Sequence, residues 1–270
     1  MLAPLDNGTI FKTAFTDKTV FKQFVKDILG IDVEVDKIET MKKFEPKEPK
    51  VGNIDITLDI FAESIDHRVI IEIQRIDYDY NFDRFLHYLM MAIAQLQKSS
   101  EEYSIDRTVY IIVVLTAPYK IDQKNNKPIK DEVMITSLDP RNLEDKVVQI
   151  YGHKLIFLNH CYRKENTPLN YRDWLDLFYE SIHNPENYHV NLNNKGIKKA
   201  VELIDVDRLS PEQLHQMKVD AQRKVVRKLD EEKARKEERI KMAKKSLREG
   251  LSIELISKLT DLSKEEIEEL

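Results

Sequence analysis

The stretch Gly52-Asn-Ile-Asp-Ile-Thr-Leu-Asp-Ile-Phe-Ala-Glu-Ser-Ile-Asp-His-Arg-Val-Ile-Ile-Glu-Ile-Gln74 decides the expected fold of this chain of 270 residues. Residues 54–62 alternate apolar with polar side chains, which is the pattern of a β-strand with one apolar face. Residues 68–73 are almost continuously β-branched, as in a strand that is buried on both faces. We therefore predict a β-hairpin whose turn is centred near Ile65.

Polar side chains meet on one face of this predicted hairpin. A turn near Ile65 places Asp59 opposite residues 72–74, beside Glu72 and Gln74, whereas Asp55 lies further along. A buried carboxylate without a partner is costly, and a bound cation removes that cost. Hard ions such as Mg²⁺ or Mn²⁺ take carboxylate oxygens, water and phosphate as ligands, and they promote phosphodiester hydrolysis. We predict that Asp59 and Glu72 bind such an ion, with Asp55 as an alternative ligand and Gln74 orienting the attacking water.

A plainer interpretation of the same acids stays open. Acids in the polar register of an antiparallel strand are most often solvated, so Asp55 and Asp59 taken alone fit a surface strand. Glu72 fits that interpretation less well, because it follows Val69-Ile-Ile71 with no polar neighbour on that side. Glu72 therefore keeps a metal site open, either active or vestigial.

The motifs in and around the hairpin carry a family resemblance. An acid on one strand, followed by Glu-x-Gln at the end of the next, resembles the PD-(D/E)XK nuclease superfamily in the variant where glutamine replaces the final lysine. The chain as a whole resembles the PD-(D/E)XK nuclease family transposases, also called recombination-promoting nucleases. The residues that carry the likeness are Asn7-Gly-Thr-Ile-Phe-Lys12, Phe61-Ala-Glu63, Ile71-Glu-Ile-Gln74, Asp83-Arg-Phe-Leu-His-Tyr88, Gln95, Tyr103 and the tail from Glu249 to Leu270.

This resemblance implies an α/β fold, with a restriction-endonuclease-like mixed sheet flanked by helices and an α-helical C-terminal tail. It implies a metal-dependent DNA endonuclease of a mobile element, acting in DNA recombination, with Asp59 and Glu72 as ligands of Mg²⁺ or Mn²⁺. Gln74 would stand in for the signature lysine, but it lacks a fixed charge and is no acid or base near neutral pH. No proline precedes Asp55 or Asp59, which leaves the first ligand open. A catalytically silent protein that binds nucleic acid or a protein partner is the alternative.

Three further residues are candidates for supporting the site or contacting DNA. Arg84 and Tyr88 lie one helical turn apart after the hairpin, so they can contact phosphate or brace the acids. A surface ion pair and a core tyrosine are the alternative for these two residues. The third candidate is Lys12, within an initial pair of amphipathic helices near residues 10–29.

Composition narrows the setting of the protein. A hydrophobic content of 41% is ample for a core, and no stretch approaches the roughly 20 apolar residues of a membrane span. With no signal-peptide pattern, we expect a cytoplasmic protein. The single cysteine, Cys161, excludes an internal disulfide, and its pairing with His160 is far more often structural than catalytic.

The net charge of −5 is unlike that of a nucleic-acid coat, so contact with DNA requires a local basic patch. A loop expected after the strand at residues 108–115 carries lysines that could follow a phosphate backbone, but a merely solvated loop is the favoured interpretation. Its lysines are Lys120, Lys124, Lys127 and Lys130.

We expect three parts: a nuclease-like domain (residues 1–205), a charged helical arm (206–250) and a short helical hairpin (251–270). Ser210-Pro-Glu-Gln213 predicts the start of the arm, which could join copies of the chain into a homo-oligomer. The other elements expected in the first part are a linker at 42–50, a helix at 79–99, strands at 108–115, 132–136 and 154–158, and helices at 171–182 and 197–204.

Overall fold

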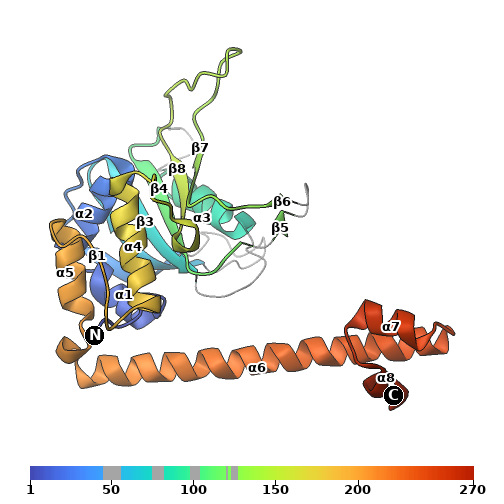
Figure 1. Ribbon diagram of the computed structural model, residues 1–270. Helices are drawn as coiled ribbons and strands as arrows, with labels where there is room; N and C mark the ends of the chain where they lie inside the picture. Colours follow the sequence, from blue (N-terminus) through green and yellow to red (C-terminus); the bar gives the residue numbers. More distant parts are fainter. Residues whose placement is uncertain (45–55, 75–81, 98–103, 120, 123–126) are drawn as a thin grey trace. The chain divides into compact units, whose positions relative to one another are not determined.

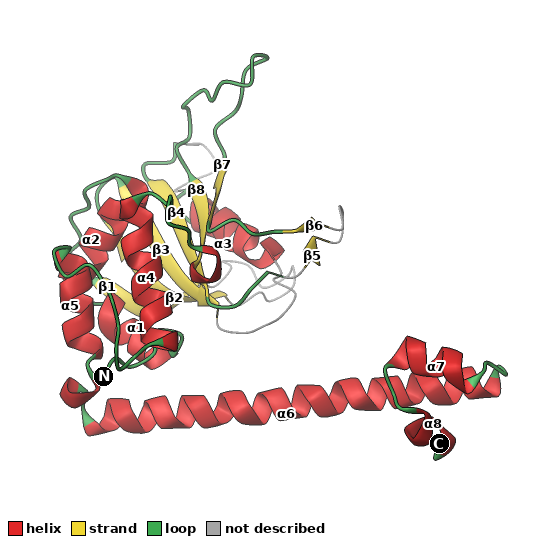
Figure 2. Cartoon of the chain, viewed as in Figure 1, coloured by secondary structure: helices red, strands yellow, loops and turns green. Residues whose placement is uncertain are grey.

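The computed structural model describes residues 1–44, 56–74, 82–97, 104–119, 121–122 and 127–270. Within them the chain divides into two compact units, Met1–Leu214 and His215–Leu270. The first unit is built on a six-stranded sheet in the order β1-β2-β3-β4-β8-β7 (Figures 1 and 2). Its strands are β1 (Ile38–Phe44), β2 (Ile56–Glu63), β3 (His67–Gln74), β4 (Thr108–Leu115), β7 (Val133–Ser137) and β8 (Lys154–Asn159).

The sheet is mixed. Strands β1, β2 and β3 form an antiparallel meander, while β3, β4 and β8 run parallel and β7 is antiparallel to β8. Parallel neighbours need a crossover, and the segment between β3 and β4 contains α3 (Phe82–Ala94). The central strand β4 is buried from Val109 to Leu115, as its unbroken apolar sequence requires. This is the mixed α/β fold that the hairpin and the resemblance predicted.

Helices cover both faces of the sheet (Figure 1). Helix α3 packs Phe85 and Leu89 against one face, in a core that includes Val113 and Phe157. The other helices of the first unit are α1 (Gly8–Phe15), α2 (Lys18–Leu29), α4 (Leu169–His183) and α5 (Lys195–Ile204). Helices α1, α2 and α4 share a fully buried group of aromatic rings: Phe11, Phe15, Phe24, Trp174 and Phe178.

The two ends of the first unit meet. Leu2 forms an isolated β-bridge with Asp205, directly after α5. The Ala3 amide donates to the Ile204 carbonyl at 2.7 Å, and the Val206 amide, in the short 3-10 helix η2 (Val206–Arg208), donates to the Met1 carbonyl at 3.0 Å. The N-terminal helices are therefore held by the last helix of the same unit.

The predicted linker at residues 42–50 is wrong at its start, because residues 42–44 belong to β1. Phe44 is buried and pairs with Ile56, whereas the residues before it are exposed or half-buried and, apart from Ile38 and Met41, polar, as an edge strand tolerates. Met41 interrupts the strand with a φ of 55°, in the left-handed region. Residues 45–50 lie outside the described part of the chain.

The predicted basic loop also needs a correction. Lys127 lies in β6 (Lys127–Pro128), which pairs with β5 (Ile121–Asp122) in a small hairpin. Lys130 is exposed, while Lys120 and Lys124 lie outside the described residues. The helix predicted at 79–99 is described as α3, and residues 79–81 and 98–99 are likewise not described.

The second unit has its own small core. Helix α6 (Pro211–Arg248), which starts in the first unit, is followed by α7 (Ile253–Thr260) and α8 (Lys264–Glu268). Ala243, Ile256, Leu262 and Ile267 are buried together where these helices meet. The start of α6 has the predicted capping box: the Ser210 amide donates to Gln213 Oε1 at 2.9 Å, and the Gln213 amide donates to Ser210 Oγ at 3.2 Å. None of the described helices is long and apolar enough to cross a membrane.

Candidate active site

The hydrogen bonds between β2 and β3 change at Asp59, where side-chain oxygens become the acceptors. The backbone register pairs Ile60 with Ile71, and the next step along β2 brings Asp59 to Glu72. There, side chains replace the backbone acceptors of the ladder. The Asp59 amide donates to Glu72 Oε1 at 2.9 Å, and the Ile73 amide donates to Asp59 Oδ2 at 3.1 Å. The structure thus places the two acids face to face.

The two carboxylates differ in burial. Glu72 is 3% exposed, whereas the Asp59 side chain is 19% exposed. Burial first, and then the neighbouring charge of Asp59, raises the pKa of Glu72 to about 8. A pair of close acids, one of them desolvated, favours a cation between them.

The donor set fits a hard divalent cation. Each carboxylate uses one oxygen in the bonds described above, which leaves Asp59 Oδ1 and Glu72 Oε2 outside those bonds. Mg²⁺ and Mn²⁺ accept one or two carboxylates and complete their shell with water and phosphate oxygens. The described residues contain no group of three or more His, Cys, Asp or Glu side chains suited to an all-protein metal site. Asp55, the alternative ligand, lies outside the described residues.

Gln74 is anchored beside these acids by its backbone. It ends β3 and lies two residues after Glu72, so the two side chains leave the strand on the same face. Its carbonyl accepts hydrogen bonds from the Thr116 amide at 3.2 Å and from Thr116 Oγ1 at 3.0 Å. The end of β3 is thereby tied to the end of β4.

A cation from α1 reaches the site. Lys12 Nζ lies 3.6 Å from Asp59 Oδ1 and donates to Met41 Sδ at 2.9 Å. Met41 stands across from Asp59 on β1, between the pairs Thr40–Ile60 and Lys42–Leu58. Sequence reasoning marked Lys12 but missed Met41, because nothing in an exposed methionine indicates that its backbone turns there.

Helix α3, which packs on the opposite face of the sheet from α1, contributes Arg84 and Tyr88. Arg84 Nε donates to Tyr88 Oη at 2.6 Å, and burial raises the pKa of Tyr88. Tyr88 is 7% exposed, packed in the core beside Phe85, while Arg84 is exposed. The positive charge of Arg84 opposes the burial that raises the pKa of Glu72. The two residues therefore lie beside the acids as a linked pair, with the arginine within electrostatic reach of Glu72.

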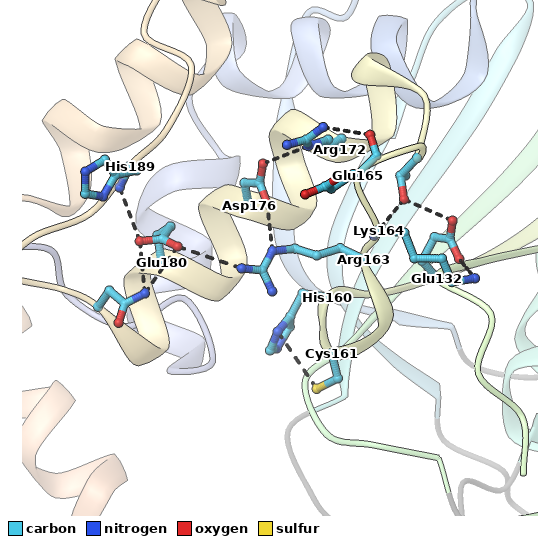
Figure 3. Close-up of polar contacts among 12 residues, drawn as sticks. Glu132, His160, Cys161, Arg163, Lys164, Glu165, Arg172, Asp176, Glu180 and His189 are labelled. Atoms are coloured by element: carbon cyan, nitrogen blue, oxygen red, sulfur yellow. Dashed lines mark hydrogen bonds and ion pairs between the residues drawn. The ribbon is translucent and has the colours of Figure 1, made fainter.

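His160 and Cys161 lie in a different environment, in the short 3-10 helix η1 (His160–Tyr162) after β8 (Figure 3). Cys161 Sγ is 3.9 Å from His160 Nδ1. Burial raises the pKa of the Cys161 thiol and lowers that of His160 to about 4, so both are neutral near pH 7. Next to them, Arg163 spans Asp176 and Glu180 of α4 and stacks on Tyr179. A thiolate–imidazolium nucleophile is not what this arrangement favours.

A family model described as PD-(D/E)XK nuclease family transposase matches residues 9–238. The chain belongs to this family. The match covers all of α1 but its first residue, the whole six-stranded sheet and most of α6, so the acids, Gln74 and Lys12 all lie within it. PD-(D/E)XK nucleases typically use divalent metal ions, and the family implies DNA as the substrate. Comparison with curated proteins and with solved structures gives no match.

Proposed function

We propose that this PD-(D/E)XK family member is a metal-dependent DNA endonuclease that uses Mg²⁺ or Mn²⁺. The observation that carries the proposal is the interlocked pair of Asp59 and Glu72 at the point where the β2–β3 ladder changes. Two acids in this position are already oriented by the backbone, and Lys12 and Arg84 supply positive charge around them. Local charge of this kind can attract a phosphate although the net charge is −5.

Asp59 and Glu72 would hold the cation, with Asp55 as a further candidate ligand. When bound, the cation polarises the scissile phosphate and makes water a better nucleophile. Gln74 positions the attacking water through its amide, which both donates and accepts hydrogen bonds. It takes no proton, so the proton that the water loses passes to solvent. Arg84 and Tyr88 brace Glu72 from α3 and offer a donor to the DNA backbone.

Nicking of a supercoiled plasmid tests this proposal. Wild-type protein is expected to nick with Mg²⁺ or Mn²⁺ and to stop in EDTA, and Asp59→Asn and Glu72→Gln are each expected to lose about 10²-fold or more of the rate. Asp66→Asn, an exposed acid in the turn of the same hairpin, is the matched control and should keep full activity. Unchanged nicking by Glu72→Gln would contradict the assignment.

A specific residue favours the second candidate function, a silent protein that binds nucleic acid or a protein partner through the same fold. Glutamine at position 74 removes the charge that the signature lysine provides. If metal-supplemented wild type binds a DNA duplex in a gel-shift assay and never cuts it, the silent function is correct and the nuclease proposal fails.

We also propose that α6 joins two copies of the chain. Val225, Val226 and Leu229 are 60%, 56% and 51% exposed on it, amid charged residues of both signs that allow the helix to pair with itself. Sedimentation of the full chain is expected to show a dimer that Val226→Glu with Leu229→Glu dissociates, while the exposed-site control Lys218→Glu does not. A monomeric wild type at high concentration would overturn this proposal.

A further inference from the structure

The candidate active site needs a positive charge that Gln74 cannot supply. In phosphodiester hydrolysis, negative charge accumulates on the non-bridging oxygens of the phosphate as water attacks. A neutral amide donates a weaker hydrogen bond to these oxygens than an ammonium group does, and it contributes no net charge. Another side chain must therefore bring a fixed positive charge to Asp59 and Glu72, and two cations lie near them, Lys12 and Arg84.

Lys12 starts from a rigid position. Helix α1 is capped by Asn7, whose side chain accepts hydrogen bonds from the amides of Thr9 and Ile10 at 3.0 and 3.3 Å. Phe11, directly before Lys12, is fully buried and stacks on Phe15 with ring centroids 4.6 Å apart. The rotation of α1 is therefore fixed by the core, and the base of the Lys12 side chain with it.

The ammonium of Lys12 is held in position by contacts with Asp59 and Met41. Its Nζ lies 3.6 Å from Asp59 Oδ1, on the carboxylate oxygen that does not accept from Ile73, and the side chain is only 25% exposed. Its bond to Met41 Sδ, at 2.9 Å, holds it from the β1 side. An ammonium has three N–H donors, so a lysine held in this way can still donate to a phosphate oxygen.

Arg84, the other cation near the acids, is engaged differently. Its Nε donates to Tyr88 Oη, and the residue is exposed. Among the described residues, the ion pair recorded for Asp59 or Glu72 is the one from Lys12. Distance, partial burial and a fixed base therefore favour Lys12 over Arg84.

We propose that Lys12 is a catalytic residue, and that its ammonium binds a non-bridging oxygen of the scissile phosphate in place of a lysine at position 74. This inference rests on the proposed nuclease function. The water oxygen forms a bond to phosphorus while the bond from phosphorus to the leaving oxygen breaks. The electron pair stays on the leaving oxygen, which takes a proton from solvent, and the attacking water loses a proton to solvent. Lys12 keeps its own protons throughout and stabilises the charge that builds up on the phosphate.

Three variants of the full chain test the proposal in the plasmid assay. Lys12→Met is expected to lose about 10²-fold or more in kcat, and Lys12→Arg is expected to retain most of the rate. Lys18→Met, an exposed lysine six residues further along, is the control and should cleave like wild type. Thermal unfolding of each variant shows whether it is folded.

A rescue variant separates a catalytic charge from a merely structural contact. The double variant Lys12→Met, Gln74→Lys supplies the positive charge from β3 instead of α1. We expect it to cleave at least tenfold faster than Lys12→Met alone. A structural role for Lys12 would leave the double variant as slow as Lys12→Met. Lys12→Met cleaving within twofold of wild type would overturn the role of Lys12 and leave the nuclease function intact. A wild type that does not cleave with either metal overturns both.

Discussion

Glu72 accepts a hydrogen bond from the backbone of Asp59, the residue whose side chain it faces, with 2.9 Å between Oε1 and the amide nitrogen. The Ile73 amide, one residue further, returns a bond to the Asp59 carboxylate. Each acid is therefore oriented by the strand that carries the other. A site built in this way is arranged before any cation arrives, and its mutation affects both chemistry and stability.

The first prediction is that, without a metal, ionisation of Glu72 lowers the free energy of unfolding as the pH rises. The folded-state pKa of Glu72, about 8, lies above its ordinary value of 4.5. Between these pH values the unfolded chain releases a proton that the folded chain keeps, so stability falls as pH rises through this window. Glutamine cannot ionise, so Glu72→Gln should lose less stability between pH 5 and pH 8. Thermal unfolding in EDTA at both pH values measures the difference, and parallel losses in the two proteins would refute it.

The second prediction is that Mg²⁺ offsets this cost. A ligand that binds only the folded state stabilises it by about 1.4 kcal/mol at a tenfold excess over Kd. Wild-type protein at pH 8 should therefore show a higher Tm as Mg²⁺ is added, and Asp59→Asn should show little change. NaCl at equal ionic strength controls for screening by salt. An equal rise of Tm in Asp59→Asn would place the ion elsewhere.

The third prediction concerns Arg68, a buried cation on β3. Its guanidinium forms an ion pair with Glu63 at 2.6 Å, donates to the Ala92 carbonyl of α3 and lies 5.5 Å from the ring centroids of both Phe44 and Phe61. Arg68→Ala leaves the Ala92 carbonyl without this donor and removes a side chain that packs on two rings, so it should cost about 1–3 kcal/mol in urea. Arg107→Ala, half-buried nearby, should cost less, since within the described part of the chain the Arg107 side chain has one hydrogen bond, from Nε to the Ser64 carbonyl. A loss below about 1 kcal/mol in Arg68→Ala would be inconsistent with this anchoring.

The fourth prediction uses the single tryptophan of the chain. The indole Nε1 of Trp174 donates to Asp27 Oδ2 at 2.8 Å, and Asn194 Nδ2 donates to the same oxygen at 2.8 Å, so one carboxylate joins α2, α4 and the start of α5. Asp27→Ala leaves the buried indole N–H without this acceptor and should cost about 1–3 kcal/mol. The fluorescence spectrum of Trp174 should shift as well in Asp27→Ala. The exposed acid Asp32, replaced by Ala, is the control, and an unshifted spectrum in Asp27→Ala would count against the contact.

The hairpin was predictable because its information is local. Alternation in β2 and the β-branched run in β3 each indicate a strand, and the turn between them sets the register that brings Asp59 to Glu72. The resemblance supplied the rest of the fold class. Strand β1 was missed because the polar residues of this edge strand, Glu39, Thr40, Lys42 and Lys43, resemble those of a linker.

Contacts between distant segments were not predictable in the same way. Nothing near Lys12 in the sequence indicates that it reaches Asp59, since that depends on how α1 rotates against the buried aromatic rings. The same holds for Asp27 and Trp174, which meet only when three helices are packed together. Periodicity identifies a face of a helix, but the partner of that face is a property of the assembled fold.

The bridge between Leu2 and Asp205 has a consequence for the nascent chain. Helix α1, with Lys12, emerges early during synthesis, but α5, against which it packs, follows roughly 180 residues later, or roughly 10–40 s at the usual rate of translation. Once Gln74 has been made, and until α5 is complete, the ribosome holds a chain that has Asp59, Glu72 and Gln74 but lacks the helix that fixes α1. The site can therefore assemble fully only after α5 has been synthesised. A fragment that ends before α5 would carry the acids but would lack the helix against which α1 and Lys12 are held.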